Sequence, residues 1–505
     1  MRVGVGIAAV LSLGMTAAPV VPPSPSASSH PPAVEVVVGS ASPADASAAV
    51  AAVGGRVVMS LPVASAVAAD VPVSALGRLD RQPGVEGVIS DRALRVADTS
   101  DPAAATLTVA STPSVYRQQV GADTLAAAGD TGQGAVVALV DTGVTPVPDL
   151  AGRLVTGLAN PTWPGGPPVD CINFSPDPTC SDGFGHGTFM AGLIAGTGAS
   201  SGGRFAGVAP GARIINIKVA GANGATDLVR VLAAVQWVVS FHQQYGISVL
   251  NLSLGNYTTT DPARDPLDLA VEQAWRSGVA VVVAAGNGGP AAGTITAPGD
   301  DPLVITAGAA NDRGTPAAAG DVAPPYTSRG PVAATGAAKP DVAAPGTAII
   351  GLQDPGSAIS SIPTEPDLQA PNFGGAYRRG SGSSMAAAIT SGVAALVYSA
   401  WSQRPGFPAG SWPADLKSEL TATATRLASP DPAALGAGVV NAAAAAARTP
   451  AAVTIPDSAP TFNWTPAEWY SSPLAGNSWE GNSWEGNSWE GNSWEGNSWE
   501  GQSWG

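Results

Sequence analysis

The chain has 505 residues, of which 45% are hydrophobic, and it contains 62 glycines and 46 prolines. This length suits one large domain with appendages, or two or three domains. Charged residues make up only 12%, which argues against a charge-laced coiled coil and against a highly charged disordered chain. The formal net charge of −15 argues against a nucleic-acid binder, because no stripe of Lys and Arg is present to neutralise phosphates.

Residues 1–32 have the features of an export signal. An apolar stretch follows Arg2 and gives way to a Pro- and Ser-rich leader. This pattern predicts a secretory signal, and therefore a secreted, extracellular protein that could associate with the cell surface. The alternative is an uncleaved membrane anchor, although the stretch is at the short end for spanning a bilayer.

Residues 33–97 carry alternating strand and helix patterns. Strands are expected over 34–38, 56–60, 64–69 and 84–90, and helices over 43–53 and 73–82. The β-α-β-β-α-β order predicts a small ferredoxin-like α+β domain. Residues 98–114 are polar and rich in Ala, Thr and Ser, which makes them an exposed linker suited to proteolysis.

Residues 115–450 form the main body. Short apolar strands are expected over 135–141, 213–219, 249–254, 280–284 and 303–307, and helices over 187–195, 226–245, 266–277 and 384–402. Such alternation predicts an α/β fold with a mainly parallel sheet and helices on both faces. Reactive groups in such sheets gather beyond the carboxyl ends of the strands.

A linker over 451–475 leads to a repeat over 476–505. The repeat unit Asn-Ser-Trp-Glu-Gly occurs five times, and six of the 13 tryptophans lie there. A period of five fits neither a helix nor a strand, so a disordered tail is expected. The tryptophans suit contact with a cell surface or with glycans, and the alternative is a passive acidic extension.

Cysteine and histidine are scarce. Cys171 and Cys180, nine positions apart, are too few for a zinc site and predict a local disulfide if the chain is exported. In a reducing compartment they would be free thiols. The histidines are His30, His186 and His242, with no His-Glu-x-x-His motif, so no catalytic metal site is expected.

Four residues are candidates for chemistry. Asp141 ends an apolar run before Thr-Gly and can orient an imidazole, although Asp-Thr-Gly also occurs in aspartic proteases. His186 lies between glycines just before an apolar helix, which suits a general base, whereas His242 fits a helix surface. Ser384 lies at the start of an Ala-rich helix, where it could be a nucleophile or only the cap of the helix. Asn287 follows a buried strand, where it could donate to an oxyanion or be an ordinary turn residue.

Taken together, these segments resemble the subtilisin-like serine proteases, or subtilases, over residues of about 115 to 450. The matching motifs are Val140-Asp141-Thr142-Gly143-Val144, Gly185-His186-Gly187-Thr188, Asn251-Leu252-Ser253-Leu254-Gly255, Ala284-Ala285-Gly286-Asn287, Ser328-Arg329-Gly330-Pro331, Lys339-Pro340-Asp341-Val342-Ala343-Ala344-Pro345-Gly346 and the segment around Ser384. The order Asp, His, Ser is that of subtilisin and differs from the order in α/β-hydrolases.

The resemblance implies a role for each residue. Ser384 would be the nucleophile, His186 the general base and Asp141 its support, with Asn287 and the Ser384 N–H binding the oxyanion. The family's substrate strand and pocket wall would correspond to Leu252, Ser253, Leu254, Gly255, Ala284, Ala285 and Gly286. No cofactor is implied for the chemistry; structural calcium is possible, but no loop with calcium-ligand spacing is visible.

The sequence departs from the family pattern at four positions. Ser383 stands for the usual Thr and Ala388 for a Pro, while Val147 and Phe189 stand where the family has His. None of the four touches the triad, so activity is expected.

The resemblance also implies a propeptide. Residues 33–97 resemble the family's propeptide, which assists folding and inhibits the enzyme until it is cut. The function expected is a secreted serine endopeptidase made as a self-processed zymogen, with protein or peptide substrates and its own propeptide as partners. The alternatives are a surface-binding protein that acts through the tail, and a processing protease dedicated to one partner.

Overall fold

A computed structural model describes residues 32–96, 114–161, 165–258, 260–361 and 375–449. The expected signal segment, most of the linker over 98–114, the linker over 451–475 and the repeat tail lie outside these residues. Within the described residues, one helix has the length and composition to cross a membrane, and it is a buried helix of the large domain.

The large domain is built on a seven-stranded sheet with the order β14-β13-β12-β10-β6-β8-β7. Every neighbouring pair of strands is parallel. The strands are β6 (Val136–Asp141), β7 (Ile172–Asn173), β8 (Arg213–Lys218), β10 (Ile247–Leu252), β12 (Ala280–Ala284), β13 (Ile305–Ala310) and β14 (Val342–Pro345). All residues of β6, β10, β12 and β13 are buried, as expected for Val-, Ile- and Ala-rich strands covered on both faces.

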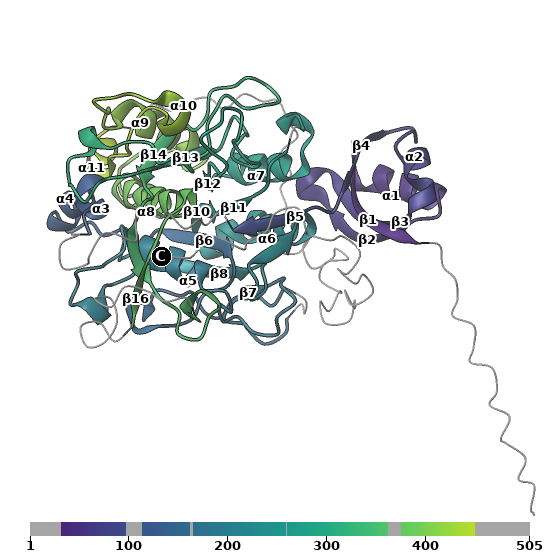
Figure 1. Cartoon of the computed structure of the whole chain (residues 1–505). Coiled ribbons are helices and arrows are strands. Elements are labelled where there is room, and N and C mark those ends of the chain that lie inside the picture. The colour runs from purple at the N-terminus through teal and green to yellow at the C-terminus, as the bar shows by residue number, and fades with distance from the viewer. Residues whose placement is uncertain (1–31, 97–113, 162–164, 259, 362–374, 450–505) are drawn as a thin grey trace, which may run out of the picture.

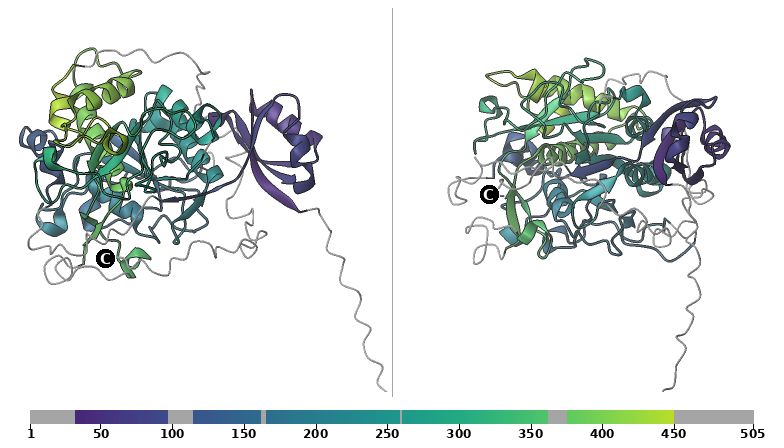
Figure 2. Two further views of the ribbon diagram at one scale, coloured as in Figure 1. Left: turned by 45° about the horizontal axis from the view of Figure 1, so that its top comes forward. Right: turned by 45° about the vertical axis from the view of Figure 1, so that its right-hand side comes forward.

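Two sets of helices cover this sheet (Figures 1 and 2). One set pairs α5 (His186–Ala195) with α8 (Ser383–Ser402), and the other contains α6 (Leu228–Tyr245), α7 (Pro266–Arg276) and α9 (Trp412–Thr423). Shorter helices are α3 (Tyr116–Gln119), α4 (Ala122–Ala127), α10 (Pro432–Leu435) and α11 (Ala442–Ala446), and a hairpin joins β15 (Ile349–Leu352) to β16 (Tyr377–Gly380). The expected α/β architecture is therefore confirmed.

The N-terminal unit is a four-stranded antiparallel sheet with two helices. Its order is β2-β3-β1-β4, built from β1 (Ala33–Ser40), β2 (Arg56–Leu61), β3 (Ala66–Pro72), β4 (Val85–Ser90), α1 (Pro43–Ala52) and α2 (Leu76–Leu79). This agrees with the expected ferredoxin-like α+β succession. The second helix is shorter than expected over 73–82, because Gly77 weakens it and Pro83 disfavours helical backbone before it.

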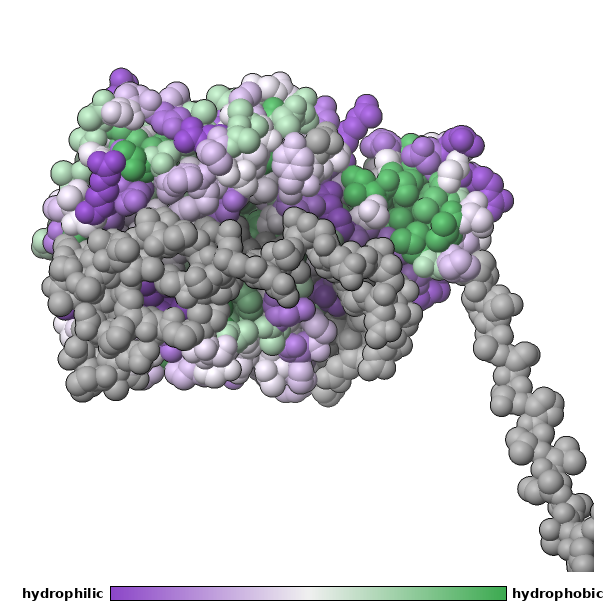
Figure 3. All heavy atoms as spheres, in the orientation of Figure 1, coloured by the Kyte–Doolittle hydropathy of each residue, from purple (hydrophilic) through white to green (hydrophobic). Residues whose placement is uncertain are grey.

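One face of this small sheet packs against its own helices, and the other packs against the large domain. Val36 and Val38 of β1 pack with α1, whereas Val37 belongs to the same apolar cluster as the large domain. Met59 and Leu61 share that cluster, and the Val63 N–H donates to Gln236 Oε1 of α6 at 3.2 Å. Figure 3 also shows an apolar area on the visible surface of the N-terminal unit. A unit of this size has a small core of its own, so docking contributes to its stability.

A short strand connects the two units. β5 (Ala93–Val96) lies between β9 (Ala225–Asp227) and β11 (Leu254–Gly255) in a three-stranded sheet, antiparallel to both. Figure 1 labels β5 and β11. The strand thus belongs by sequence to the N-terminal part of the chain and by hydrogen bonding to the large domain.

The expected disulfide is present between Cys171 and Cys180. It closes a loop against the end of the sheet, where Asn216 Nδ2 donates to the Cys180 carbonyl at 3.2 Å and Lys218 Nζ to the Ser181 carbonyl at 2.6 Å. The crosslink therefore holds a segment that precedes His186 by only a few residues.

We predict that replacing both cysteines with serine lowers the free energy of unfolding by about 2–3 kcal/mol, because the unfolded chain regains the freedom of a short ring. Guanidinium titration followed by tryptophan fluorescence measures the change. Reduced wild-type protein serves as the control and should unfold at the same midpoint as the double variant. Equal stability of the oxidised wild type and the variant would contradict the prediction.

Candidate active site

An Asp-His pair lies at the carboxyl end of β6. Asp141 is the last residue of this strand, and its Oδ1 is 2.7 Å from Nδ1 of His186, the first residue of α5. Both side chains are 1% exposed. The same Asp141 oxygen accepts the Thr142 N–H at 2.8 Å, which fixes the carboxylate. A ring that donates its Nδ1 proton to this carboxylate has its basic lone pair on Nε2.

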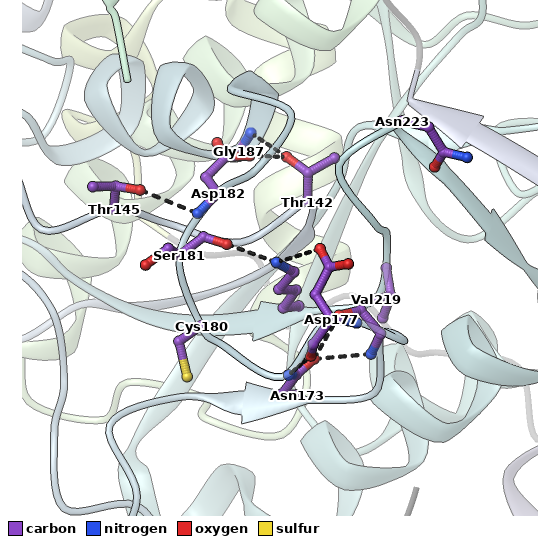
Figure 4. Close-up of polar contacts among 12 residues, drawn as sticks. Thr142, Thr145, Asn173, Asp177, Cys180, Ser181, Asp182, Gly187, Val219 and Asn223 are labelled. Carbon is purple, nitrogen blue, oxygen red and sulfur yellow. Dashed lines mark hydrogen bonds and ion pairs between the residues drawn. The ribbon is translucent and has the colours of Figure 1, made fainter. Parts of the chain in front are cut away.

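Hydrogen bonds of Thr142 and Asp182 connect the loop after β6 to the loop before α5 (Figure 4). Thr142 Oγ1 donates to Asp182 Oδ1 at 2.7 Å and accepts the Gly187 N–H at 2.9 Å. The Asp182 carboxylate also accepts the N–H groups of Gly185 and Thr188, at 2.6 and 2.7 Å. Burial raises the pKa of Asp182, and these hydrogen bonds oppose the rise. The network fixes the first turn of α5, and with it the backbone of His186.

Ser384 is the second residue of α8, a helix that packs against α5. Its Oγ donates to the Ser253 carbonyl at 3.2 Å, and Ser253 Oγ donates to the Ser384 carbonyl at 3.2 Å. The serine is therefore locked to the residue that joins β10 to β11. The first turn of α8 also leaves backbone N–H groups without helical partners, which favours negative charge nearby.

Asn287 follows β12 and is held in one orientation. Its Oδ1 accepts the Ser383 N–H at 2.9 Å, and this contact assigns the other terminal atom as Nδ2. Nδ2 is buried and has no partner among the described residues. Ser383 Oγ in turn accepts the Gly286 N–H at 3.1 Å, so the serine at this position supplies the hydroxyl that a threonine would. The arrangement presents an amide donor next to Ser384.

The expected substrate residues lie in two segments, one from the end of β10 through β11 and one at the end of β12. Leu252 ends β10, Ser253 follows it, and β11 pairs Leu254 with Val96 and Gly255 with Arg95. The Ala284–Ala285–Gly286 segment follows from β12, with the Ala285 carbonyl accepting the Thr296 N–H at 3.1 Å. Sequence patterns did not predict β5 or β9, because strands of three or four residues give no periodic signal without their partners.

Three further expectations concern His242, Phe189 and a metal site. His242 lies near the end of α6, where Nδ1 contacts the Val239 carbonyl at 2.7 Å and burial lowers its pKa. Phe189, which replaces a histidine of the family pattern, packs on the β15–β16 hairpin, since a Cβ at Gly351 would lie 2.6 Å from its ring. No group of three His, Cys, Asp or Glu side chains in the described part of the chain is placed to hold a metal.

The parallel sheet, its two helix layers, the Asp141–His186 pair and the serine at the start of α8 define a subtilisin-like α/β protein. The chain belongs to the subtilase family, whose model matches residues 132–440. It is 38% identical over 317 residues to the "Serine protease AprX" of Bacillus subtilis, covering 62% of this chain and 66% of that protein. It is also 37% identical over 171 residues to "Subtilisin Savinase" of Lederbergia lenta, covering 34% of this chain and 53% of the relative.

A similar solved structure is fervidolysin from Fervidobacterium pennivorans, described as a keratinolytic enzyme related to subtilisin. The TM-score is 0.62 at 23% identity, over 84% of this chain and 62% of fervidolysin, and this likeness supports the fold. The chain thus spans less than two thirds of the length of each of these three proteins.

We predict that Gly187→Ala destabilises the domain by about 1–3 kcal/mol, a typical cost of overpacking. A Cβ at Gly187 would lie 2.1 Å from the Gly143 carbonyl oxygen and 3.2 Å from Asp141 Cβ. Thermal unfolding measures the loss. Gly288→Ala is the matched control, because its Cβ would meet nothing closer than 3.5 Å. Equal melting temperatures for the two variants would show that the close approach is not required.

Proposed function

We propose that this chain is a serine endopeptidase that hydrolyses peptide bonds through an acyl-enzyme intermediate. The observation that carries the proposal is the buried Asp141–His186 hydrogen bond. Ser384, the expected nucleophile, is hydrogen-bonded to Ser253, which directly precedes β11, and β11 pairs with the extended strand β5. Family membership supports it independently. The substrates would be proteins or peptides that add a strand along β11.

Each side chain would have one step in the reaction. Ser384 Oγ attacks the peptide carbonyl while His186 takes its proton and then passes it to the leaving amine. Asp141 stabilises the imidazolium between these transfers. Asn287 Nδ2 and the Ser384 N–H donate to the oxyanion, and a water activated by His186 releases the acyl group. All of these groups belong to the chain, so the proposed chemistry needs no cofactor.

The N-terminal unit would be a propeptide, removed by the enzyme itself. β5 is antiparallel to β11, and Val96 faces Leu254. The next residue beyond Leu254 on the opposing strand is Ser253, whose carbonyl is 3.2 Å from Ser384 Oγ. We therefore place the processing cut directly after this strand, at the Ala97–Asp98 bond. Export would follow from the signal-like segment, and the Cys171–Cys180 disulfide fits an oxidising compartment.

Substitution of the nucleophile and of the oxyanion donor tests this function. Ser384→Ala should leave the full-length chain uncut, whereas wild type should yield a new N-terminus at Asp98, read by mass spectrometry. Asn287→Ala should lower kcat by about 10²–10³-fold with little change in KM, because the lost donor acts on the transition state. A fluorophosphonate that labels Ser384 measures active enzyme. Equal processing of wild type and Ser384→Ala would exclude self-cleavage.

Acidic side chains meet where the N-terminal unit docks on α6. Glu35 extends from β1, Asp91 follows β4, and Asp227 precedes α6; Asp91 Oδ1 accepts the Val229 N–H at 3.2 Å. Burial, reinforced by neighbouring carboxylates, raises the pKa of Glu35 to about 7 and that of Asp91 to about 8. Asp70 faces Glu35 as a further acid, and the cations that face the cluster are Arg56 and Arg230.

These shifts predict that docking weakens as the pH rises. Release exposes both carboxyls to water and removes Asp227 from them, so their pKa values fall back toward the ordinary values near 4, and the docked unit binds more protons than the released unit over the range up to about 8. The docking free energy is therefore greatest below about pH 4, falls as the pH rises to about 8, and is constant above that. A Ser384→Ala chain with an inserted cleavage site in its linker, cut by an unrelated protease, should keep the N-terminal unit at pH 5 and lose more of it at pH 8.

Gel filtration of the cut chain across this pH range measures retention. Glu35→Gln combined with Asp91→Asn should flatten the dependence, since neither replacement ionises. A release profile that is the same in this variant and in the parent would contradict the assignment to these two carboxyls.

A further inference from the structure

We propose that the peptidase domain contains a binding subsite for an arginine side chain, formed by Asp265 and Asn256 and occupied in the precursor by Arg92. In the mature enzyme this subsite would select substrates with arginine at the sixth position before the cleaved bond. The inference rests on the proposed function and on the processing cut after Ala97, from which the position is counted.

Arg92 makes three polar side-chain contacts with the large domain. Its Nη2 is 2.8 Å from both carboxylate oxygens of Asp265, and its Nε donates to Asn256 Oδ1 at 3.0 Å. Asp265 is 0% exposed and the Arg92 side chain 14%. The Arg92 carbonyl also accepts the Leu228 N–H at 3.1 Å, so the backbone is held as well. Such contacts use the fork of a guanidinium, and a lysine could make only part of them.

The subsite residues are fixed by the large domain itself. Asp265 is the N-cap of α7 and accepts the Leu267 N–H at 3.0 Å. Asn256 follows β11 directly and exchanges two backbone hydrogen bonds with Ala297, at 3.0 and 3.3 Å. Neither residue depends on Arg92 for its position. The site would therefore persist after the N-terminal unit leaves.

Further carboxyl groups make this region favourable to a cation. Asp268 is fully buried, and neither of its carboxylate oxygens has a partner among the described residues. Burial raises the pKa of Asp268, and Asp300 and Asp265 raise it further, whereas Arg92 lowers it. Removing Arg92 leaves these acids without that positive charge. The contacts of Arg92 Nη2 with Asp265 and of Arg92 Nε with Asn256 show that a guanidinium fits this geometry.

The subsite and the proposed cleaved bond would be reached by one extended peptide that follows β5. Arg92 directly precedes β5, and alternate residues of an extended chain point to the same side, so Arg92 and Leu94 share one direction. Leu94 is wholly buried in the apolar cluster of the large domain. A bound peptide that follows β5 would then place an apolar residue at the position of Leu94 and a guanidinium at that of Arg92. The two contacts would set the register of the substrate.

Matched peptides test the subsite. Mature enzyme is given peptides that differ only at the sixth position before the cleaved bond, which carries Arg, Lys or Gln. We expect kcat/KM for Arg to exceed that for Gln by about tenfold or more, with Lys between them, because Nη2 makes charge-assisted hydrogen bonds to Asp265 and only arginine adds the Nε contact to Asn256. Asp265→Asn should reduce the Arg-to-Gln ratio to near one, because asparagine keeps the helix cap and loses the charge.

Two further variants separate the outcomes. Asn256→Ala should lower the ratio by losing the Nε contact, and it serves if Asp265→Asn does not fold. Asp261→Asn is the matched control, since Asp261 caps a nearby turn through the Ala263 N–H and should leave the ratio unchanged. An active enzyme that cleaves the Arg and Gln peptides equally would overturn the subsite. Failure to cleave any peptide, together with no fluorophosphonate labelling, would instead overturn the proposed function.

Discussion

The parallel pairing of β6, β10 and β12 positions the candidate active site. Parallel strands end at the same edge of the sheet, so each of these three neighbours delivers one functional group there. Asp141 ends β6, Ser253 follows β10 and Asn287 comes shortly after β12. A change of register between any two strands would separate these groups by several ångströms. Packing of the apolar strands therefore carries the alignment that the chemistry requires.

Hydrogen bonds between side chains and loop backbone complete this alignment. Thr142 and Asp182 together receive three N–H groups from the start of α5, and Ser383 holds the Gly286 N–H. Buried backbone donors need such partners, because water cannot reach them. At position 383 the serine hydroxyl accepts the Gly286 N–H, a contact that a threonine hydroxyl could also make.

Long, regular segments were predictable from the sequence, and short or paired features were not. The strands β6, β8, β10 and β12 agree with the expected ranges within about two residues, since buried parallel strands read as apolar runs. The motifs also indicated Asp141 and His186. The strand β5 and the Arg92–Asp265 pair were missed. Each partner of that pair looks like an ordinary surface arginine or helix cap, and 173 positions separate them.

The three-stranded sheet explains why one surface can serve both inhibition and catalysis under the proposed function. β9 and β11 are edges whose N–H and C=O groups need an extended partner, and β5 fills the space between them. Backbone pairing is independent of side chains, so any extended peptide can replace β5 there. Selectivity must then come from side chains that reach beyond the ladder. The buried position of Leu94 in β5 and the contacts of Arg92, which directly precedes β5, with Asp265 and Asn256 are two such points.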